Sequence, residues 1–344
     1  MSKLISFGIP SYNSQDYMEH CIETLLTGKD KVEIIIVDDG SKDKTGEIAD
    51  RYAAKYPDIV RVIHQENGGH GSGVMAALRQ AKGLYYKVVD SDDWVSEEAL
   101  QVLLKQIEKH QEENVVVDLY ITNYVYEHVA DQTQHRMGYH GIIPENRVIG
   151  WEDVRKFPTS TVLLMHSLLY RREALLESGM ELPKHTFYVD NVYAYQPLPK
   201  MKTLFYMDID FYRYFIGRAD QSVNMENFFK RYEQQIRVMK MMLGAYSYDE
   251  LKKMSKGLRR YMFHDLSILM LTTMLFINGG TSEKEKRKEL YHELWVWLKK
   301  NDPKLYRKIR YRSYVSSCYW MFWGLRRKVL ISGYRIAQKK LKLG

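Results

Sequence analysis

The chain has 344 residues, of which 45% are hydrophobic, and it carries a net charge of +8. This composition excludes global disorder, and the length is sufficient for one large catalytic domain with a smaller second unit. The charge is unevenly distributed along the chain. Residues 301–344 contain twelve Lys and Arg and one acidic residue, a net charge of +11, so the first 300 residues carry a net charge of −3. The two cysteines, Cys21 and Cys318, lie far apart and indicate no disulfide framework, which favours a reducing, cytoplasmic compartment.

The first hundred residues alternate apolar runs with amphipathic stretches. Apolar runs at residues 4–9, 33–37, 60–63 and 85–89 predict strands, and the stretches between them predict helices. This alternation predicts an α/β fold with a doubly wound mixed sheet and right-handed crossovers. Ligands bind such sheets beyond the carboxyl ends of the strands, so we expect the functional site there.

Two serines are predicted helix caps. Ser14 precedes the first helical stretch, which Gly28 would end, and Ser96 precedes a helical stretch over residues 97–111. Both predictions depend only on local sequence.

The rest of the chain changes character once. Residues 115–223 mix predicted strands with polar loops, and a mostly helical pattern follows. We therefore predict one domain over residues 1–225 and a helical extension over residues 226–344. The longest apolar runs, at residues 266–277 and 314–325, have 12 residues each. They are shorter than the roughly 20 that a membrane-spanning helix needs, and no signal peptide is expected before the first strand.

The most informative motif is Asp90-Ser91-Asp92, directly after the fourth predicted strand. In an extended chain, residues i and i+2 point to the same side, so the two carboxylates can hold one hard cation such as Mn²⁺ or Mg²⁺. Alternatively, one carboxylate takes the metal and the other a ribose hydroxyl. The structural alternative is a strand-end turn or a helix cap, which Asp93 could supply alone.

A second acidic pair and a glycine-rich loop follow other predicted strands. Asp38 and Asp39 could accept a hydrogen bond from a nucleobase or a ribose, or could simply precede a helix capped by Ser41. The loop over residues 67–73 could approach a phosphate through its backbone, with Asn67 and Gly69 as candidate contacts. We interpret His70 within it as a loop histidine rather than a catalytic residue.

These motifs, taken in order, resemble the inverting family 2 glycosyltransferases with the A-type fold. The residues that carry the resemblance are Ile9-Pro10-Ser11-Tyr12-Asn13, Val37-Asp38-Asp39-Gly40-Ser41, Asn67-Gly68-Gly69, Ala81-Lys82-Gly83 and Asp90-Ser91-Asp92-Asp93. The resemblance covers roughly the first hundred residues and is thinner beyond them.

The resemblance implies a nucleotide-sugar donor, with UDP as the expected nucleotide. It places the base against Asp38 or Asp39 and the ribose against Asp90. The metal on the diphosphate would bind Asp92, and Pro10 and Tyr12 would line the nucleotide pocket. Many members have Asn where this chain has Met75, so a polar contact from that position is not expected.

An inverting transfer also needs a base for the acceptor hydroxyl. The family usually supplies it from a Glu-Asp pair opening a helix, and this chain has Val189-Asp190 at the matching place. Asp190 is therefore the candidate base, unless it only caps that helix. Arg218, in a segment similar to a lid of related enzymes, could offset charge on the leaving diphosphate or pair with a structural acid.

Residues 301–344 form a basic, aromatic tail. This tail suits an anionic membrane surface better than a nucleic acid, because no nucleic-acid motif accompanies it. We expect a metal-dependent glycosyltransferase at the inner face of the cell membrane, and a homo-oligomer is one arrangement open to it. Its acceptor would be a saccharide or lipid-linked saccharide in cell-surface polysaccharide synthesis. The alternatives are a non-catalytic nucleotide-binding scaffold of an assembly complex and, more remotely, a nucleotidyltransferase.

Overall fold

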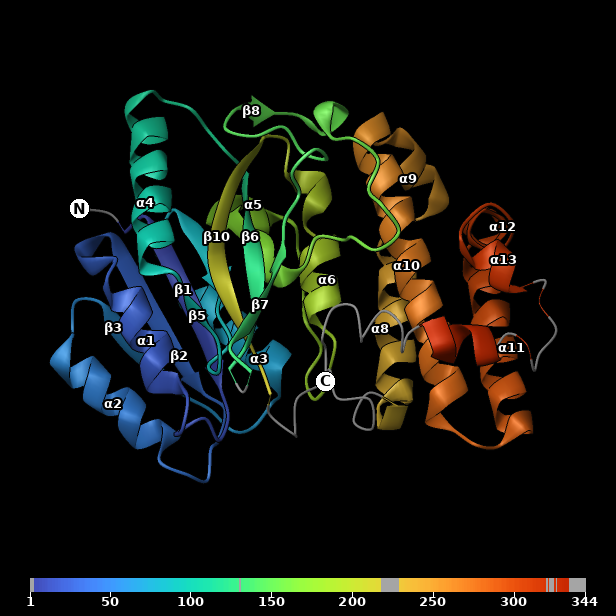
Figure 1. Cartoon of the computed structure of the whole chain (residues 1–344), viewed down its shortest axis with the longest axis horizontal. Coiled ribbons are helices and arrows are strands. Elements are labelled where there is room, and N and C mark those ends of the chain that lie inside the picture. Colours follow the sequence, from blue (N-terminus) through green and yellow to red (C-terminus); the bar gives the residue numbers. More distant parts are fainter. Residues whose placement is uncertain are drawn as a thin grey trace. The chain divides into compact units, whose positions relative to one another are not determined.

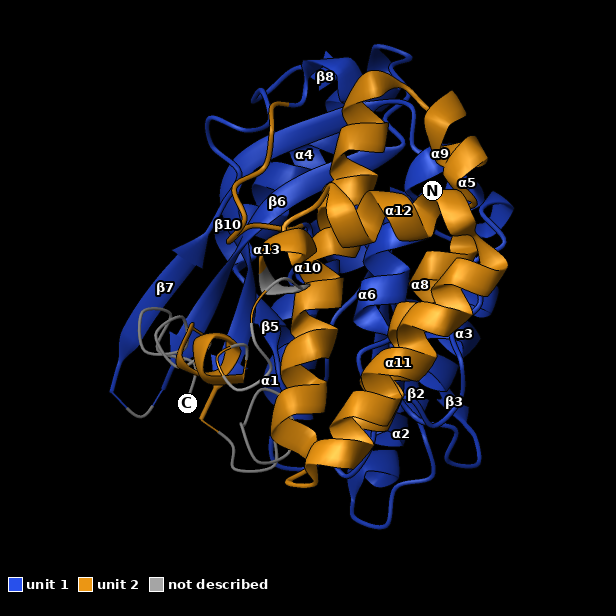
Figure 2. Cartoon of the chain, turned by 90° about the vertical axis from the view of Figure 1, so that its right-hand side faces the viewer, with its two compact units in different colours: residues 1–154, 163–215 blue, residues 155–162, 216–344 orange. Residues whose placement is uncertain are grey.

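The computed structural model describes residues 3–129, 131–217, 229–319, 321, 325 and 327–333. The chain forms two compact units, coloured separately in Figure 2. Unit 1 comprises Met1–Val154 and Leu163–Phe215, and unit 2 comprises Arg155–Val162 and Ile216–Gly344. The sequence prediction had placed one boundary after residue 225. The segment Arg155–Val162 belongs to unit 2 although unit 1 precedes and follows it along the chain.

Unit 1 is built on one mixed sheet (Figure 1). Its strands are β1 (Ile5–Ser11), β2 (Val32–Asp38), β3 (Val60–His64), β4 (Tyr85–Val88), β5 (Trp94–Val95), β6 (Leu119–His128), β7 (Thr133–Met137), β8 (Val148–Ile149), β9 (Leu168–Arg171) and β10 (Leu204–Ile216). The strand order is β3-β2-β1-β4-β9-β6-β10-β5, with β7 on β6 and β8 on β10. The first four strands are parallel, and β9 runs antiparallel to β4 and β6.

Helices cover both faces of this sheet, as a doubly wound arrangement requires. They are α1 (Met18–Leu26), α2 (Thr45–Lys55), α3 (His70–Gln80), α4 (Glu97–Glu112), α5 (Arg172–Glu177) and α6 (Asp190–Tyr195), with short 3-10 turns at Lys29–Lys31, Trp151–Asp153, Met165–Ser167 and Leu198–Lys200. Figures 1 and 2 show α1 and α3 on opposite faces. The predicted mixed, doubly wound sheet is confirmed.

The central strands are buried along their whole length, which explains their continuous apolar sequence. Glu33 in β2 is a charged exception, only 5% exposed. Its carboxylate accepts hydrogen bonds from Ser6 Oγ, the Lys82 and Gly83 backbone N–H groups and Arg61. A buried carboxylate is tolerated when its hydrogen bonds are made in this way.

One of the two predicted helix caps is correct. Ser96 caps α4, and its Oγ accepts a hydrogen bond from Ala99 N. Ser14 is not a cap, because α1 begins at Met18 after Tyr17. The Oγ of Ser14 lies instead 2.7 Å from Ser91 Oγ, so this hydrogen bond joins the loop after β1 to the acidic motif after β4.

Unit 2 is helical, as predicted. Its helices are α8 (Tyr232–Ala245), α9 (Tyr248–Lys253), α10 (Lys256–Gly280), α11 (Lys284–Asn301), α12 (Pro303–Tyr311) and α13 (Val315–Tyr319). Among the described residues, α10 is the one helix long and apolar enough to cross a membrane, but 72% of its apolar window is buried inside the protein. Such burial is typical of a core helix.

Candidate functional site

The acidic motif forms a tight turn directly after β4. Asp93 N donates to the carbonyl of Asp90 at 2.9 Å, which closes the turn. Tyr212 on β10 bridges its two ends, because Asp90 N donates to Tyr212 Oη at 3.2 Å and Tyr212 Oη donates to Asp93 at 2.6 Å. Asp92 lies half-buried between them. The turn is therefore anchored to a strand that follows it by more than a hundred residues.

Asp93 is the structural member of this acidic turn. It is 3% exposed, and it also accepts a hydrogen bond from Phe215 N at 2.8 Å. Burial, followed by the neighbouring charges of Asp92 and Asp90, raises the pKa of Asp93 well above its usual range. Asp93 does not cap α4, because Ser96 has that role.

The pKa of Asp90 is shifted in the opposite direction to that of Asp93. Its Oδ1 lies 2.7 Å from Nε2 of His70, the first residue of α3. Burial alone would raise the pKa of Asp90, but the charge and hydrogen bond of His70, with His166 and Lys87, lower it overall. The turn thus combines an ionised carboxylate with one that favours its proton.

His70 is a candidate site residue that the sequence prediction missed. Burial opposes its protonation, but Asp90, and then Asp190 and Asp92, raise the pKa of His70 overall. Its imidazole therefore interacts with both the acidic turn and the start of α6. No local pattern identified it, because its partners come from other parts of the chain.

Asp190 opens α6 but does not cap it. The N-cap position is Val189, and no side chain accepts a capping hydrogen bond there. Burial raises the pKa of Asp190, and the nearby charge of Asp90 adds to this while His70 opposes it. The structural alternative considered for Asp190 is therefore not realised.

Asp38 and Tyr12 line a pocket at the carboxyl ends of β1 and β2. The pocket has a volume of about 550 Å³ and is lined by Tyr12, Asp38, Gly40, Lys42, His64, Gln65, Glu66 and Asn67. Tyr12 is 50% exposed there, which leaves aromatic surface open to solvent. Burial would raise the pKa of Asp38, but hydrogen bonds from Ser41 and His64 lower it, so its carboxylate is ionised.

Asp39 is not among the residues that line this pocket, and its carboxylate holds the glycine loop. Its carboxylate accepts hydrogen bonds from Gly68 N at 2.8 Å, Gly69 N at 2.7 Å and Gln65 Nε2 at 2.6 Å. Those backbone N–H groups are thus already paired within the protein. The structure separates the two neighbouring aspartates, with Asp38 at the pocket and Asp39 beneath the loop.

The remaining predicted contacts are distributed as follows. Asn67 lines the pocket, and its Nδ2 donates to the carbonyl of Asp39 at 2.9 Å. Pro10 is buried in β1 against Gly73, where an added Cβ would meet it at 2.9 Å. Met75 is 5% exposed and belongs to the core, in agreement with its apolar side chain. Arg218 lies outside the described residues.

A buried lysine beneath the turn was not predicted either. Lys87 on β4 is 1% exposed, and its Nζ donates to the carbonyls of His166 at 2.7 Å and Leu168 at 3.2 Å. Burial lowers the pKa of Lys87 to about 7. This side chain therefore joins the start of β9 and the residues just before it to β4, the strand that precedes the acidic motif.

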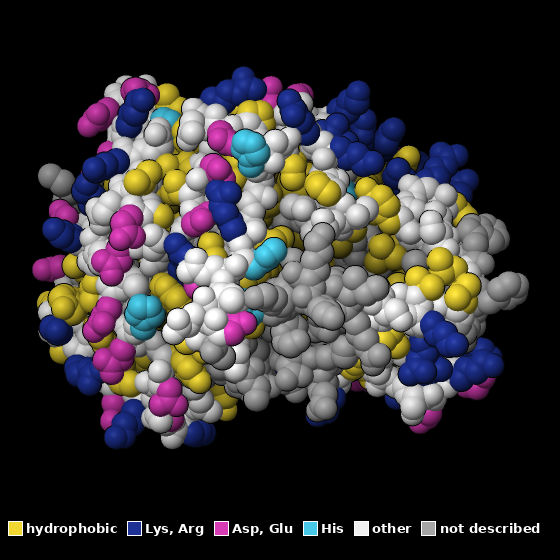
Figure 3. Space-filling model, viewed as in Figure 1, with side chains coloured by type: hydrophobic (Ala, Val, Ile, Leu, Met, Phe, Trp, Pro, Cys, Tyr) yellow, Lys and Arg dark blue, Asp and Glu magenta, His cyan; other side chains and the backbone are white. Residues whose placement is uncertain are grey.

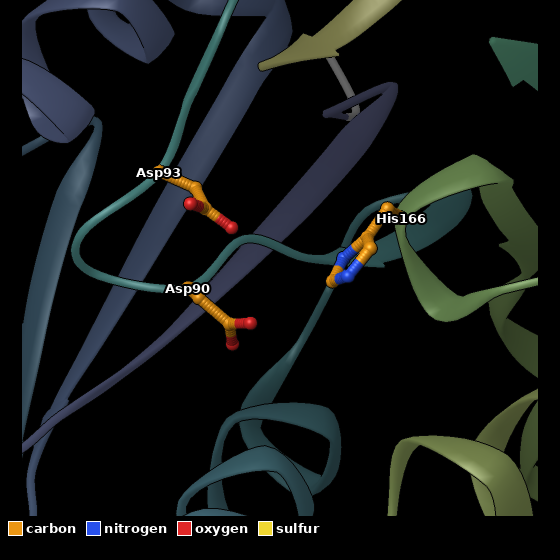
Figure 4. A group of neighbouring side chains, drawn as sticks. All are labelled: Asp90, Asp93 and His166. Atoms are coloured by element: carbon orange, nitrogen blue, oxygen red, sulfur yellow. The ribbon is translucent and has the colours of Figure 1, made fainter. Parts of the chain in front are cut away.

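Asp90, Asp93 and His166 form a group whose carboxylate oxygens and ring nitrogen lie within 4.8 Å of one another. Figure 4 shows the three side chains pointing into a common space, with the aspartates on the turn and the histidine on the opposite segment. Two carboxylates and an imidazole are ligands suited to a divalent cation. The donor set in this part of unit 1 therefore fits a divalent cation, but the group does not include Asp92, the predicted metal ligand.

Comparison with known proteins agrees with this architecture. The uncharacterized glycosyltransferase EpsJ of Bacillus subtilis (strain 168) is 42% identical over 112 residues, which make up 32% of this chain and 32% of that protein. The aligned region thus spans about a third of that relative.

Two solved structures share the fold. TarS 1–349 of S. aureus in complex with UDP-GlcNAc matches with a TM-score of 0.64 and 18% identity, over 97% of this chain and 92% of that one. The mannosyltransferase PcManGT of Pyrobaculum calidifontis, in complex with GDP-Man and Mn²⁺, matches with a TM-score of 0.51 and 14% identity, over 96% and 86%. At these identities the likeness shows the fold, and the predicted A-type fold is confirmed.

The match to a family model is more specific. The model described as glycosyl transferase family 2 covers residues 6–178, which include the acidic turn, both residues of the Asp38-Asp39 pair and the glycine loop. Because this match spans half of the chain and contains most of the site, the protein belongs to glycosyl transferase family 2.

Proposed function

We propose that the protein is an inverting glycosyltransferase that requires Mn²⁺ or Mg²⁺. It would move a sugar from a UDP-sugar to a hydroxyl of a saccharide or lipid-linked saccharide in cell-surface polysaccharide synthesis. One observation supports this most directly. Nε2 of His70 lies 2.7 Å from the ionised carboxylate of Asp90, and the charge of His70 also interacts with Asp190, which does not cap α6. Both carboxylates lie at the edge of the sheet where ligands of α/β folds bind.

The nucleoside would occupy the pocket beside Asp38. A volume of about 550 Å³ suits a nucleoside, and Tyr12 offers an aromatic face on which a base can stack. The ionised Asp38 can accept a hydrogen bond from a base N–H or a ribose hydroxyl. The complex of TarS with UDP-GlcNAc supports a uridine donor for a protein of this fold.

The carboxylates of the acidic turn would hold the divalent cation, with Asp92 as the predicted ligand and Asp90 beside it. When bound, the cation neutralises charge that develops on the departing diphosphate. PcManGT, whose structure contains Mn²⁺ and GDP-Man, supports this proposal through its fold. The orientation of the donor would therefore depend on the turn that Tyr212 and Ser14 hold in place.

Asp190 would accept the proton of the acceptor hydroxyl. As that proton leaves, the acceptor oxygen forms a bond to the anomeric carbon and the bond from that carbon to the diphosphate breaks, which releases UDP and inverts the configuration. The raised pKa of Asp190 makes it a stronger base than an ordinary aspartate. Its partial burial keeps bulk water from competing for the proton.

The proposal is tested with Asp190→Asn in the purified full chain, which removes the base without changing the size of the side chain. We expect the transfer rate to fall about 100-fold or more, because general-base catalysis contributes about that much. Binding of UDP in the presence of Mn²⁺, measured by calorimetry, should remain within about threefold of the original value.

Asp58→Asn, an exposed carboxylate before β3, is the matched control and should leave both quantities unchanged. Full transfer by Asp190→Asn would contradict the assignment of the base. If the unaltered protein binds UDP but transfers no sugar to any acceptor of a broad panel, the non-catalytic scaffold becomes the better interpretation. Val189, in place of the usual Glu, is the residue that keeps this second interpretation open.

We also propose that unit 2 brings the enzyme to the inner face of the cell membrane. In α12, Leu305 and Ile309 are buried whereas Lys304 and Arg307 are exposed, so one face of the helix is basic. Figure 3 shows Lys and Arg side chains gathered over the upper part of unit 2 in that view. A basic face of this kind suits anionic lipid headgroups. Most of the basic residues after Arg312 lie outside the described residues.

A further inference from the structure

We propose that His166 is a direct ligand of the divalent cation, together with Asp90 and Asp93. This rests on the proposed metal-dependent transfer, but it assigns the carboxylate ligands to Asp90 and Asp93 in place of the predicted Asp92. It also adds a nitrogen ligand that the sequence motif does not contain. The metal site would then join the turn after β4 to the segment before β9, more than seventy residues further along the chain.

The geometry carries the first part of the argument. The candidate ligand atoms of Asp90, Asp93 and His166 all lie within 4.8 Å of one another. Ligands on opposite sides of a small divalent cation are separated by about 4.2 Å, because each metal–ligand distance is about 2.1 Å. Atoms this close together are within reach of one shared ion, and Figure 4 shows that the three side chains face one another.

The second, independent observation is the state of the histidine itself. His166 is 6% exposed, and among the described residues its Nδ1 is a buried atom without a hydrogen-bond partner. A buried polar atom is normally paired, so an unpaired one in a native structure calls for a missing partner. A cation bound through Nδ1, between this imidazole and the two carboxylates, would supply that partner.

The protein also holds the ring in a defined orientation. The carbonyl of His166 accepts a hydrogen bond from Lys87 Nζ at 2.7 Å, which fixes its backbone. The ring stacks on Tyr212 with centroids 4.7 Å apart and meets Tyr214 edge-on at the same distance. Such support from surrounding groups is what orients metal-binding histidines in known sites. Tyr212 contacts all three proposed ligands, since it also bonds Asp90 and Asp93.

Asp93 can take part although its oxygens already accept hydrogen bonds. Tyr212 Oη donates to one oxygen and Phe215 N to the other. Coordination requires the ionised form of Asp93, which a bound cation favours. That form has about four acceptor positions, so each oxygen retains one for the cation. A cation would also relieve the repulsion among Asp90, Asp92 and Asp93.

A nitrogen ligand has a consequence that can be measured. Mg²⁺ prefers oxygen ligands, whereas imidazole suits transition metals. With His166 in place, the protein should therefore bind Mn²⁺ more tightly than Mg²⁺. Replacing the imidazole with an amide should weaken Mn²⁺ binding and reduce the preference for Mn²⁺ over Mg²⁺.

The experiment is a titration of the purified full chain with Mn²⁺, in which free Mn²⁺ is followed by electron paramagnetic resonance and Mg²⁺ is added as a competitor. We expect His166→Gln to raise the Kd for Mn²⁺ about tenfold or more, and the Kd for Mg²⁺ by less than about threefold. The matched control is His128→Gln, because His128 is also buried in unit 1 with an unpaired ring nitrogen but is not part of the acidic group.

Equal Mn²⁺ affinity in His166→Gln and His128→Gln would overturn the proposal and leave His166 a core residue packed on Tyr212. If His166→Gln does not fold, electron spin-echo spectroscopy of Mn²⁺ bound to the unaltered protein decides instead. Modulation from an imidazole ¹⁴N nucleus is expected, and its absence would exclude a histidine ligand. Absence of Mn²⁺ binding to the unaltered protein would contradict the proposed metal requirement itself, which is a different failure.

Discussion

At the scale of single residues, His70 links the acidic turn to α6. Its Nε2 lies 2.7 Å from Asp90, and its charge interacts with Asp190 and Asp92 as well. The partially exposed pair, with side chains 34% and 23% exposed, contributes to stability only while both groups are charged. This makes the pair a source of pH dependence in the free protein.

The sign of that dependence follows from the two pKa shifts. The pKa of His70 is raised above its ordinary value of 6.5, so its contribution is fully present below pH 6.5 and is lost as the pH rises through the raised value. The pKa of Asp90 is lowered below 3.8, so its contribution is present above that pH and is lost on acidification. The pair of His70 and Asp90 should therefore stabilise the fold most between pH 3.8 and pH 6.5, the ordinary pKa values of the two groups.

We predict that His70→Gln lowers the free energy of unfolding by about 1 kcal/mol near pH 5.5, and by less near pH 9. Urea denaturation at the two pH values, with EDTA present, measures the difference. His292→Gln, an exposed histidine of unit 2, serves as control and should show no such change. An effect of His70→Gln that grows with pH would contradict the assigned pair.

At the scale of elements, the glycine loop before α3 connects three segments of unit 1. Asp39, at the end of β2, accepts from two of its backbone N–H groups, and His185 N donates to the carbonyl of Gly68 at 2.7 Å. Gly69 has φ +80° and lies so close to His185 that an added Cβ would meet His185 N at 3.0 Å. The loop therefore helps to position the segment that leads to Asp190.

Substitution of this glycine should be more damaging than its backbone conformation alone implies. We predict that Gly69→Ala lowers the free energy of unfolding by about 2–3 kcal/mol, because strain and a backbone clash add. Gly141→Ala is the control for backbone strain alone, because Gly141 has φ +73° but no atom lies within 4 Å of an added Cβ. This variant should lower the free energy of unfolding by about 1 kcal/mol. Chemical denaturation of both variants checks the order, and equal losses would show that His185 yields to the new methyl group.

At the scale of the whole molecule, the two units differ in charge and in composition. Unit 1 contains the acidic turn and the pocket, whereas unit 2 contains the basic α12. The buried face of α12 makes deletion of the tail a poor test of membrane binding, because Leu305 and Ile309 belong to the core of unit 2. Charge reversal on the exposed face changes the surface and leaves that core intact.

We predict that the double variant Arg307→Glu and Arg312→Glu weakens sedimentation with anionic vesicles about tenfold or more, because each basic residue near such a surface contributes about 1 kcal/mol. Both side chains are exposed. The control applies the same charge change to exposed residues of α4, as Lys105→Glu and Lys109→Glu, and should bind normally. Equal binding by the two double variants would show that this face does not contact the membrane.

The sequence by itself determined the α/β alternation, the mixed sheet and the positions of the acidic motifs at strand ends. It could do so because hydrophobic periodicity and turn residues act over a few neighbouring positions. Only the tertiary structure decided what each acid does. It placed Asp38 at the pocket and Asp39 under the glycine loop, and it fixed Asp93 to Tyr212, 119 residues away.

The same distinction applies to the histidines. His70 and His166 have no motif of their own, and their importance arises from Asp90, which lies 20 residues from the first and far from the second along the chain. Hydrogen bonds and charges act through space, so partners at such separations meet only after the sheet has formed. The sequence therefore located the carboxylates of this family 2 glycosyltransferase, and the fold selected the imidazoles that surround them.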